Sequence, residues 1–187
     1  MTLTFNQICR DYLASRGESP DLLPLLDEGE DSAVLTLSDQ LRVQLPAMAL
    51  DATLATPAVF QDEIQAVESI PESVDNGTLI FRMPDDYLKL HSLKMADWEE
   101  DVTEVEPADS LRYALGANAP EWMVCAERPM VKEVRDSLGI ALHVYGSRRQ
   151  GRAEQLLYVP RPAFDGEHLT ISRAAYLTLL KNLRNLQ

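Results

Sequence analysis

The chain has 187 residues, of which 45% are hydrophobic and 25% are charged, a balance that is ordinary for a soluble globular protein. Its formal net charge of −13 argues against loose, charge-driven binding to nucleic acid or to an anionic membrane, because both need a cationic surface. The length suffices for one domain with a sizeable core and a helical appendage.

Neither the cysteines nor the first residues indicate an exported protein. Cys9 and Cys125 are far apart and match no zinc or redox spacing, so we expect packed thiols in a reducing compartment. The N-terminal stretch lacks a basic segment followed by a long apolar run, and no stretch approaches the roughly 18 apolar residues of a membrane span. We therefore expect a product made or assembled inside a cell, with no membrane partner.

Residues 1–60 predict a helical region. Two groups of residues recur at helical spacing, namely Phe5, Ile8, Tyr12 and Leu13, and Leu41, Leu45, Met48 and Ala52. Gly17 suits the end of the first helix, and Pro46 is expected to kink the second, which spans about 38–55, or to mark a restart. The stretch from Glu18 to Asp31 carries six acids and no base, and its prolines predict a loop.

Residues 61–187 predict a β-rich core that includes a short helix and ends in a long one. The expected strands are 78–83, 88–95, 129–134, 140–145 and 155–160. A short helix is expected at 108–115, and the segment 166–187 predicts a terminal helix. The residues expected mainly on one face of that helix are Leu169, Tyr176, Leu177, Leu180 and Leu183. The expected fold class is α+β, with helices at both ends flanking a mainly antiparallel sheet, because the β-α-β alternation of nucleotide-binding sheets is absent.

The stretch that most resembles a catalytic or metal site is Asp85–Asp86 after Pro84, with His91 a few positions later. A paired-acid catalyst needs one carboxyl with a pKa raised by an apolar pocket, and nothing in the sequence indicates such a pocket. Aspartates after a proline commonly cap backbone N–H groups of a turn, so we predict that the pair caps a turn and ends a strand. Phosphate-binding loops, a nucleophile elbow and zinc-ligand spacings are all missing, so no catalytic residue, metal or cofactor is predicted.

Charged side chains form the remaining candidate sites. The last two strands are expected to form a hairpin around the loop GSRRQGRAE. Its arginines could be solvated, or they could bind a carboxylate surface or a phosphate backbone. Seven acids and no base lie between Asp97 and Asp109. The candidate interface residues are Arg148, Arg149 and Arg152 of the loop, Asp97, Glu99, Glu100 and Asp101 of the acidic segment, and Lys181 and Arg184 of the terminal helix.

The order of these elements resembles a known family. A strand followed by MPDDYLKL, a second strand and a tryptophan in LHSLKMADWEEDV is similar to a passage in head-to-tail connector proteins of tailed bacteriophages, in particular the ring-forming neck proteins of crAss-like phages. The segments SLRYALGANAP, RPMVKEV, LHVYGS and LLYVPRP continue the resemblance into the terminal helix. It covers residues 35–187 and rests on short motifs.

The resemblance implies a structural virion protein without an active site, assembled in the cytoplasm of the host bacterium. It implies a homo-oligomeric ring of about twelve copies that links the portal to the tail and extends the DNA channel. The implied partners are further copies of the chain, the portal protein, adjacent neck or tail proteins, and double-stranded DNA passing transiently through the lumen. The first 60 residues are then the region expected to dock on the portal.

Two other classes of function stay open at this point. One is a bacterial adaptor or accessory protein that binds a partner through the leucines at 22–26. The other is a hydrolase of an unfamiliar kind that uses Asp85 or Asp86 together with His91.

Overall fold

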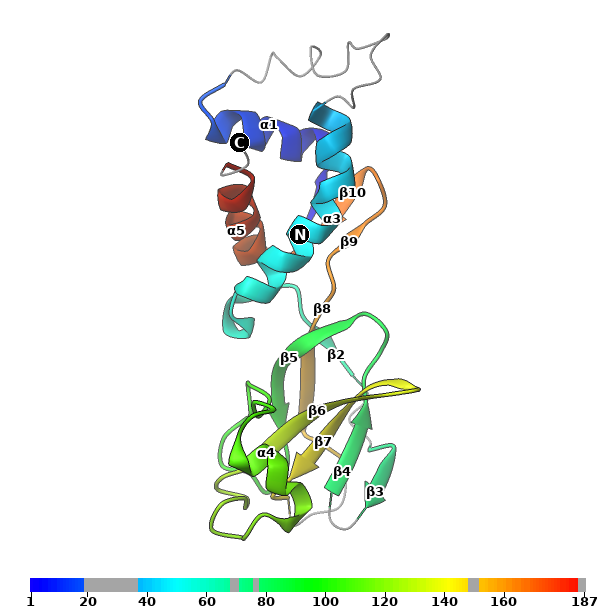
Figure 1. Cartoon of the computed structure of the whole chain (residues 1–187), viewed down its shortest axis with the longest axis vertical. Coiled ribbons are helices and arrows are strands. Elements are labelled where there is room, and N and C mark those ends of the chain that lie inside the picture. Colours follow the sequence, from blue (N-terminus) through cyan, green and yellow to red (C-terminus); the bar gives the residue numbers. More distant parts are fainter. Residues whose placement is uncertain (19–36, 68–70, 76–77, 148–151, 185–187) are drawn as a thin grey trace. The chain divides into compact units, whose positions relative to one another are not determined.

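The structure, a computed structural model, describes residues 1–18, 37–67, 71–75, 78–147 and 152–184 (Figure 1). The chain forms two compact units, and each is described separately. Unit 1 comprises Met1–Glu63 and Arg161–Gln187, and unit 2 comprises Ile64–Pro160. The terminal helix therefore belongs with the N-terminal helices, whereas the sequence had placed it with the β-rich region. The expected α+β class is confirmed, since helices at both ends accompany small antiparallel sheets.

Unit 1 combines helices with one small sheet. Its helical elements are α1 (Phe5–Ser15), α3 (Leu37–Ala55), the 3-10 turn η2 (Ala58–Phe60) and α5 (Arg173–Arg184). Its strands are β1 (Thr2–Thr4), β9 (Ala163–Phe164) and β10 (His168–Thr170), which pair antiparallel in the order β1-β10-β9. The two ends of the chain thus meet in one sheet, where Leu3 lies opposite Leu169.

The start of α1 is determined locally. The Thr4 hydroxyl accepts a hydrogen bond from the Gln7 N–H, and the Gln7 side chain accepts one from the Thr4 N–H, so the two residues form a capping box. Gly17, with φ of +75°, follows the last turn in the left-handed conformation that glycine adopts without strain. The four residues that predicted this helix are all buried, which confirms the expected inward face.

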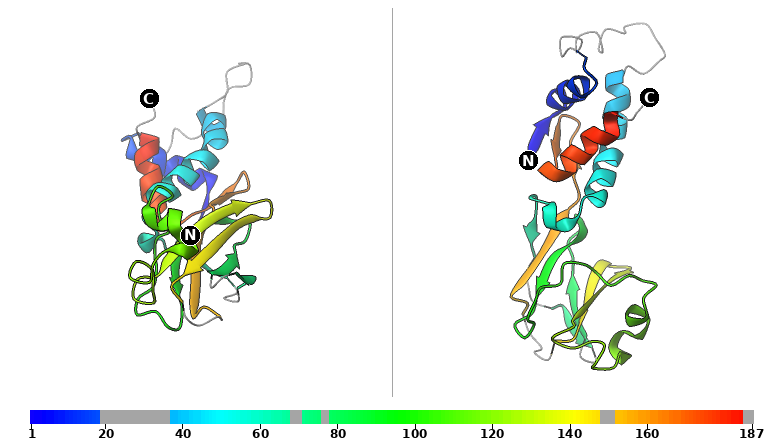
Figure 2. Two further views of the ribbon diagram at one scale, coloured as in Figure 1. Left: turned by 60° about the horizontal axis from the view of Figure 1, so that its bottom comes forward. Right: turned by 90° about the vertical axis from the view of Figure 1, so that its left-hand side faces the viewer.

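Helix α3 runs through Pro46 as one assigned helix rather than restarting there, although the proline removes one backbone donor. Its inward residues are Leu41, Leu45, Ala49 and Ala52, with Met48 packed partly buried beside them. Near its end the hydroxyls of Thr53 and Thr56 donate to the carbonyls of Ala49 and Ala52. Figures 1 and 2 show α3 and α5 side by side, and the core of unit 1 lies between α1, α3 and α5.

The terminal helix is shorter than the sequence predicted. Residues 168–170 form β10, because β1 offers them a partner, and α5 begins only at Arg173. The Arg173 N–H donates to the Asp62 carboxylate at 2.8 Å, and the Ala175 N–H donates to the Ser172 hydroxyl at 3.1 Å. Side chains of the preceding turn and of a distant loop therefore satisfy the first amides of α5.

Unit 2 is built from two antiparallel sheets. Its strands are β2 (Gln65–Ala66), β3 (Ser73–Asp75), β4 (Thr78–Arg82), β5 (Tyr87–Lys94), β6 (Met130–Asp136), β7 (Gly139–Tyr145) and β8 (Gln155–Pro160). The sheet orders are β2-β8-β5 and β3-β4-β7-β6. Between β5 and β6 lie the short helix α4 (Leu111–Leu115) and the 3-10 turn η3 (Gly116–Asn118). All five expected strands and the expected short helix are present.

One connection differs from the prediction. The strands β7 and β8 were expected to form a hairpin around GSRRQGRAE, but β7 pairs with β4 and β6, while β8 pairs with β2 and β5. The two strands lie in different sheets, so their link is a crossover between sheets. Alternating apolar residues predict that each segment is a strand, but they do not specify which strand pairs with it.

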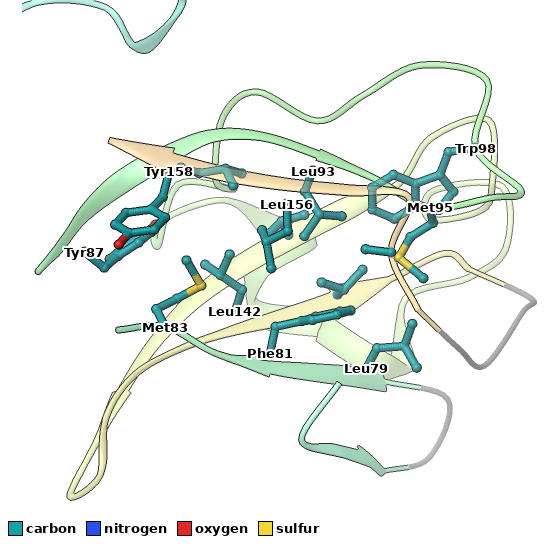
Figure 3. Close-up of a cluster of buried hydrophobic side chains, with 14 of the residues drawn as sticks. Leu79, Phe81, Met83, Tyr87, Leu93, Met95, Trp98, Leu142, Leu156 and Tyr158 are labelled. Carbon is teal, nitrogen blue, oxygen red and sulfur yellow. The ribbon is translucent and has the colours of Figure 1, made fainter. Parts of the chain in front are cut away.

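The apolar faces of both sheets form the core of unit 2 (Figure 3). Leu79, Phe81 and Met83, from β4 and its end, line one side of this core with Leu156 on the other side, and Met95 lies beside Trp98. The rings of Tyr87 and Tyr158 are 5.9 Å apart at their centroids, within the range of favourable aromatic pairs. In the part of the chain that the structure describes, no helix has the length and apolar character needed to cross a bilayer.

Candidate functional site

The Asp85–Asp86 turn joins β4 to β5. The Tyr87 N–H donates to the Pro84 carbonyl at 3.0 Å, which closes the expected turn. Asp85 is exposed, whereas Asp86 is half-buried and its Oδ1 accepts a hydrogen bond from the Tyr158 hydroxyl at 2.8 Å. The expectation that Asp86 caps a local N–H group is corrected, because its hydrogen-bond partner in the structure belongs to the neighbouring strand β8. Burial, together with the bond to Asp86, raises the pKa of Tyr158 to about 12.

The structure does not bring His91 to this turn. His91 lies further along the extended strand β5, roughly 16 Å from Asp86 at a rise of about 3.3 Å per residue. One of its ring nitrogens lies 3.3 Å from the Ser92 hydroxyl. Within the described residues, no group of three or more His, Cys, Asp or Glu side chains is placed to hold a metal ion. Asp85, Asp86 and His91, which the hydrolase hypothesis would use together, therefore do not meet in one site.

A cavity of about 400 Å³ lies next to Tyr158 in unit 2. Its lining consists of Ala66, Val67, Arg82, Met83, Pro84 and Tyr158. The only cation among these residues, Arg82, forms two hydrogen bonds to Asp136 at 2.8 and 3.1 Å and one to Glu72 at 3.1 Å. The Arg82 guanidinium holds the pKa of Asp136 below its usual range. The Arg82 guanidinium is thus already bound by carboxylates of the same chain. The other residues that line the cavity are mainly apolar, so it offers a ligand no unpaired cation.

The acidic segment after β5 is fixed on the β core. Val102 exchanges two backbone hydrogen bonds with Leu93, both of 2.8 Å, and Trp98 is buried at 4% exposure. These inward anchors leave Glu99, Glu100 and Asp101 exposed. The candidate carboxylates therefore lie on an ordered part of unit 2 rather than on a free tail.

Asp97 differs from its neighbours because it has a partner within the chain. Its Oδ1 accepts a hydrogen bond from the Ser147 hydroxyl at 2.9 Å, and the Glu154 N–H donates to the Lys94 carbonyl at 2.8 Å. Ser147 and Glu154 flank the basic loop in the sequence, so the described ends of that loop lie beside the start of the acidic segment. Arg152 is exposed, and Arg148 and Arg149 lie outside the described residues.

The exposed face of α5 carries the other candidate cations. Lys181 and Arg184 are exposed, as are Arg173 and Leu177. The inward residues are Ala175, Tyr176, Leu179 and Leu183. The prediction that Leu177 belongs to the buried face is wrong, because Leu177 is 55% exposed and Leu179 is the leucine that reaches the core. The Tyr176 hydroxyl donates to the Asp11 carboxylate at 2.6 Å, which ties α5 to α1.

Unit 2 contains a buried cation that the sequence pattern did not indicate. Lys132 on β6 is 9% exposed, and its Nζ lies 4.3 Å from the ring centroid of Tyr113 and 5.5 Å from that of Tyr145. Gly116, at φ of +53°, passes so close that a Cβ there would lie 2.8 Å from this Nζ. Burial lowers the pKa of Lys132. The one available signal was a lysine inside the apolar strand PMVKEV, and that signal does not distinguish a buried lysine from an outward-facing one.

Comparison with known proteins adds no relative to this description: no protein-family model matches the sequence, and no curated protein sequence matches it.

Proposed function

We propose that this chain is a structural subunit of the head-to-tail connector of a tailed bacteriophage. In this proposal copies of the chain form a ring that links the portal to the tail and extends the channel for DNA. The partners are further copies, the portal protein and adjacent neck or tail proteins. The protein acts in the virion by assembling, and it needs no cofactor for this.

The observation that carries the proposal is the position of the residues behind the resemblance. The passage from MPDDYLKL to the tryptophan supplies core residues of unit 2, namely Met83, Tyr87, Leu90, Leu93, Met95 and Trp98. The later segments of the resemblance lie on α4, β6, β7 and β8, and the short strands β9 and β10 then precede α5. Core residues bear on the fold, and a fold alone does not determine a function. The resemblance therefore concerns residues that determine the fold, and the connector function is the proposal that we attach to that fold.

The charge of the chain is compatible with a DNA channel. Cationic walls hold a duplex by releasing its condensed counterions, whereas a wall with few unpaired cations lets the duplex slide. The excess of acids gives this chain a net charge of −13. Copies with that charge repel one another unless their contact joins faces of opposite sign, as a head-to-tail interface permits.

The mass of the purified full-length protein tests the proposal. We would measure it by size-exclusion chromatography with light scattering, alone and after mixing with the portal protein encoded in the same genome. We expect a ring visible by negative-stain electron microscopy in either sample. The fraction of assembled protein should fall as the salt concentration is raised, because salt screens the charges at the contact. A protein that stays monomeric at high concentration in both samples would overturn the proposal.

A further inference from the structure

One exposed face of α5 is basic. The side chains of Arg173, Leu177, Lys181 and Arg184 follow one another at helical spacing on the side opposite the buried residues, and we call them the basic stripe. Within the described parts of the chain, none of its three cations forms an ion pair. Because the stripe belongs to a helix whose other face is buried, its side chains project from a fixed backbone.

Unit 2 carries an exposed surface of the opposite sign. It consists of the side chains of Glu99, Glu100, Asp101, Glu104 and Asp109, which we call the acidic strip. Trp98 is buried beside it, and Val102 and Val105 pack against the same core, so the strip is anchored at several points along its length. Its carboxylates form no ion pair with the described residues.

We propose that the basic stripe of one copy binds the acidic strip of a second copy. The inference rests on the proposed function and assigns residues to the contact between subunits. Charge complementarity selects the partner: each copy carries both surfaces, so every copy can donate one and accept the other. Such a contact joins unlike faces, and this is the type of interface that closes a ring. Leu177 supplies an apolar contact among the cations, and because single exposed ion pairs are weak, the interface depends on several of them together.

Reciprocal charge reversal tests the proposal in the full-length protein. One variant carries Lys181→Glu and Arg184→Glu, and the other carries Glu99→Lys, Glu100→Lys and Asp101→Lys. Either variant alone presents two surfaces of the same sign, so each should stay monomeric at concentrations at which the unmodified protein is assembled. Mixed in equal amounts, they should assemble again, because each acidic surface then meets a basic one. Light scattering and negative-stain microscopy measure both results.

A matched control separates the interface from net charge. The double variant Arg10→Glu and Arg135→Glu changes the charge of the chain as much as reversal of α5 does, at exposed positions outside the stripe. It should assemble like the unmodified protein. Circular dichroism and tryptophan fluorescence of every variant should match those of the unmodified protein, because all the substituted side chains are exposed.

Three results would overturn the proposal. If the Lys181→Glu and Arg184→Glu variant forms rings as readily as the unmodified protein does, the stripe is not the contact, although the ring itself stands. If this variant forms normal rings that no longer bind the portal protein, the stripe serves the portal instead. If the unmodified protein assembles neither alone nor with the portal protein, the proposed function fails and this contact fails with it.

Discussion

Gly146, directly after β7, is the position at which a single methyl group should damage unit 2 most clearly. Its φ is +87°, and a Cβ there would lie 2.6 Å from the Cys125 carbonyl oxygen and 3.0 Å from its carbonyl carbon. A residue with a side chain costs about 1–2 kcal/mol in the left-handed region. The contact with backbone atoms adds to this, because Cys125 exchanges hydrogen bonds with Arg128 and cannot shift alone. We expect Gly146→Ala to lower the free energy of unfolding by about 2–4 kcal/mol.

Two further variants separate strain from steric overlap. Gly146→Asn keeps the Cβ but adopts positive φ more readily than alanine, so it should recover little of the loss. Gly17→Ala has a similar φ of +75° with nothing within 4 Å of the added Cβ, and it should lose only about 1–2 kcal/mol.

Urea unfolding followed by tryptophan fluorescence measures unit 2 selectively, because both tryptophans, Trp98 and Trp122, belong to it. Circular dichroism at 222 nm reports mainly on the helices of unit 1 and serves for the Gly17 variant. Equal losses for Gly146→Ala and Gly17→Ala, or full recovery in Gly146→Asn, would refute the steric argument.

Two other substitutions test single contacts of unit 2 by the same fluorescence assay. Asp86→Asn weakens the acceptor of the Tyr158 hydroxyl and should lower the free energy of unfolding by about 1 kcal/mol, whereas Asp85→Asn, at the exposed neighbouring position, should change little; equal effects of the two would contradict the assigned bond. Asp136→Asn tests the pairing with Arg82. The pKa of Asp136 is lower in the folded state than in the unfolded state. The ionised carboxylate therefore stabilises the folded protein at pH values above the unfolded pKa of about 3.9, and this stabilisation is lost as the pH falls through the folded-state pKa. The urea midpoint of the variant should therefore lie below that of the unmodified protein near neutral pH and approach it in acid, and a difference that persists undiminished in strong acid would refute this origin.

Local patterns in the sequence determined the type of most elements. The spacing of Phe5, Ile8 and Tyr12, with Gly17 after the last turn, is enough to predict α1, because these residues lie within a few positions of one another. The runs TLIFRM and IALHVY predict strands in the same way. Trp98 and the charged residues after it could be recognised as a distinct segment from composition alone.

Contacts between distant residues were decided only by the tertiary structure. A strand pattern does not name its partner, so the crossover from β7 to β8, the pairing of β1 with β10 and the hydrogen bond from Tyr158 to Asp86 could not be predicted. Which leucine of α5 is buried depends on where α1 and α3 lie: Leu177 and Leu179 are about 200° apart around the helix axis, so only one of them can face that core. Lys132 is buried because two tyrosine rings from separate segments meet over it, a circumstance that its own neighbours in the sequence do not encode. These features depend on pairings between residues far apart in the chain, and a side-chain period of two or 3.6 residues carries no information about them.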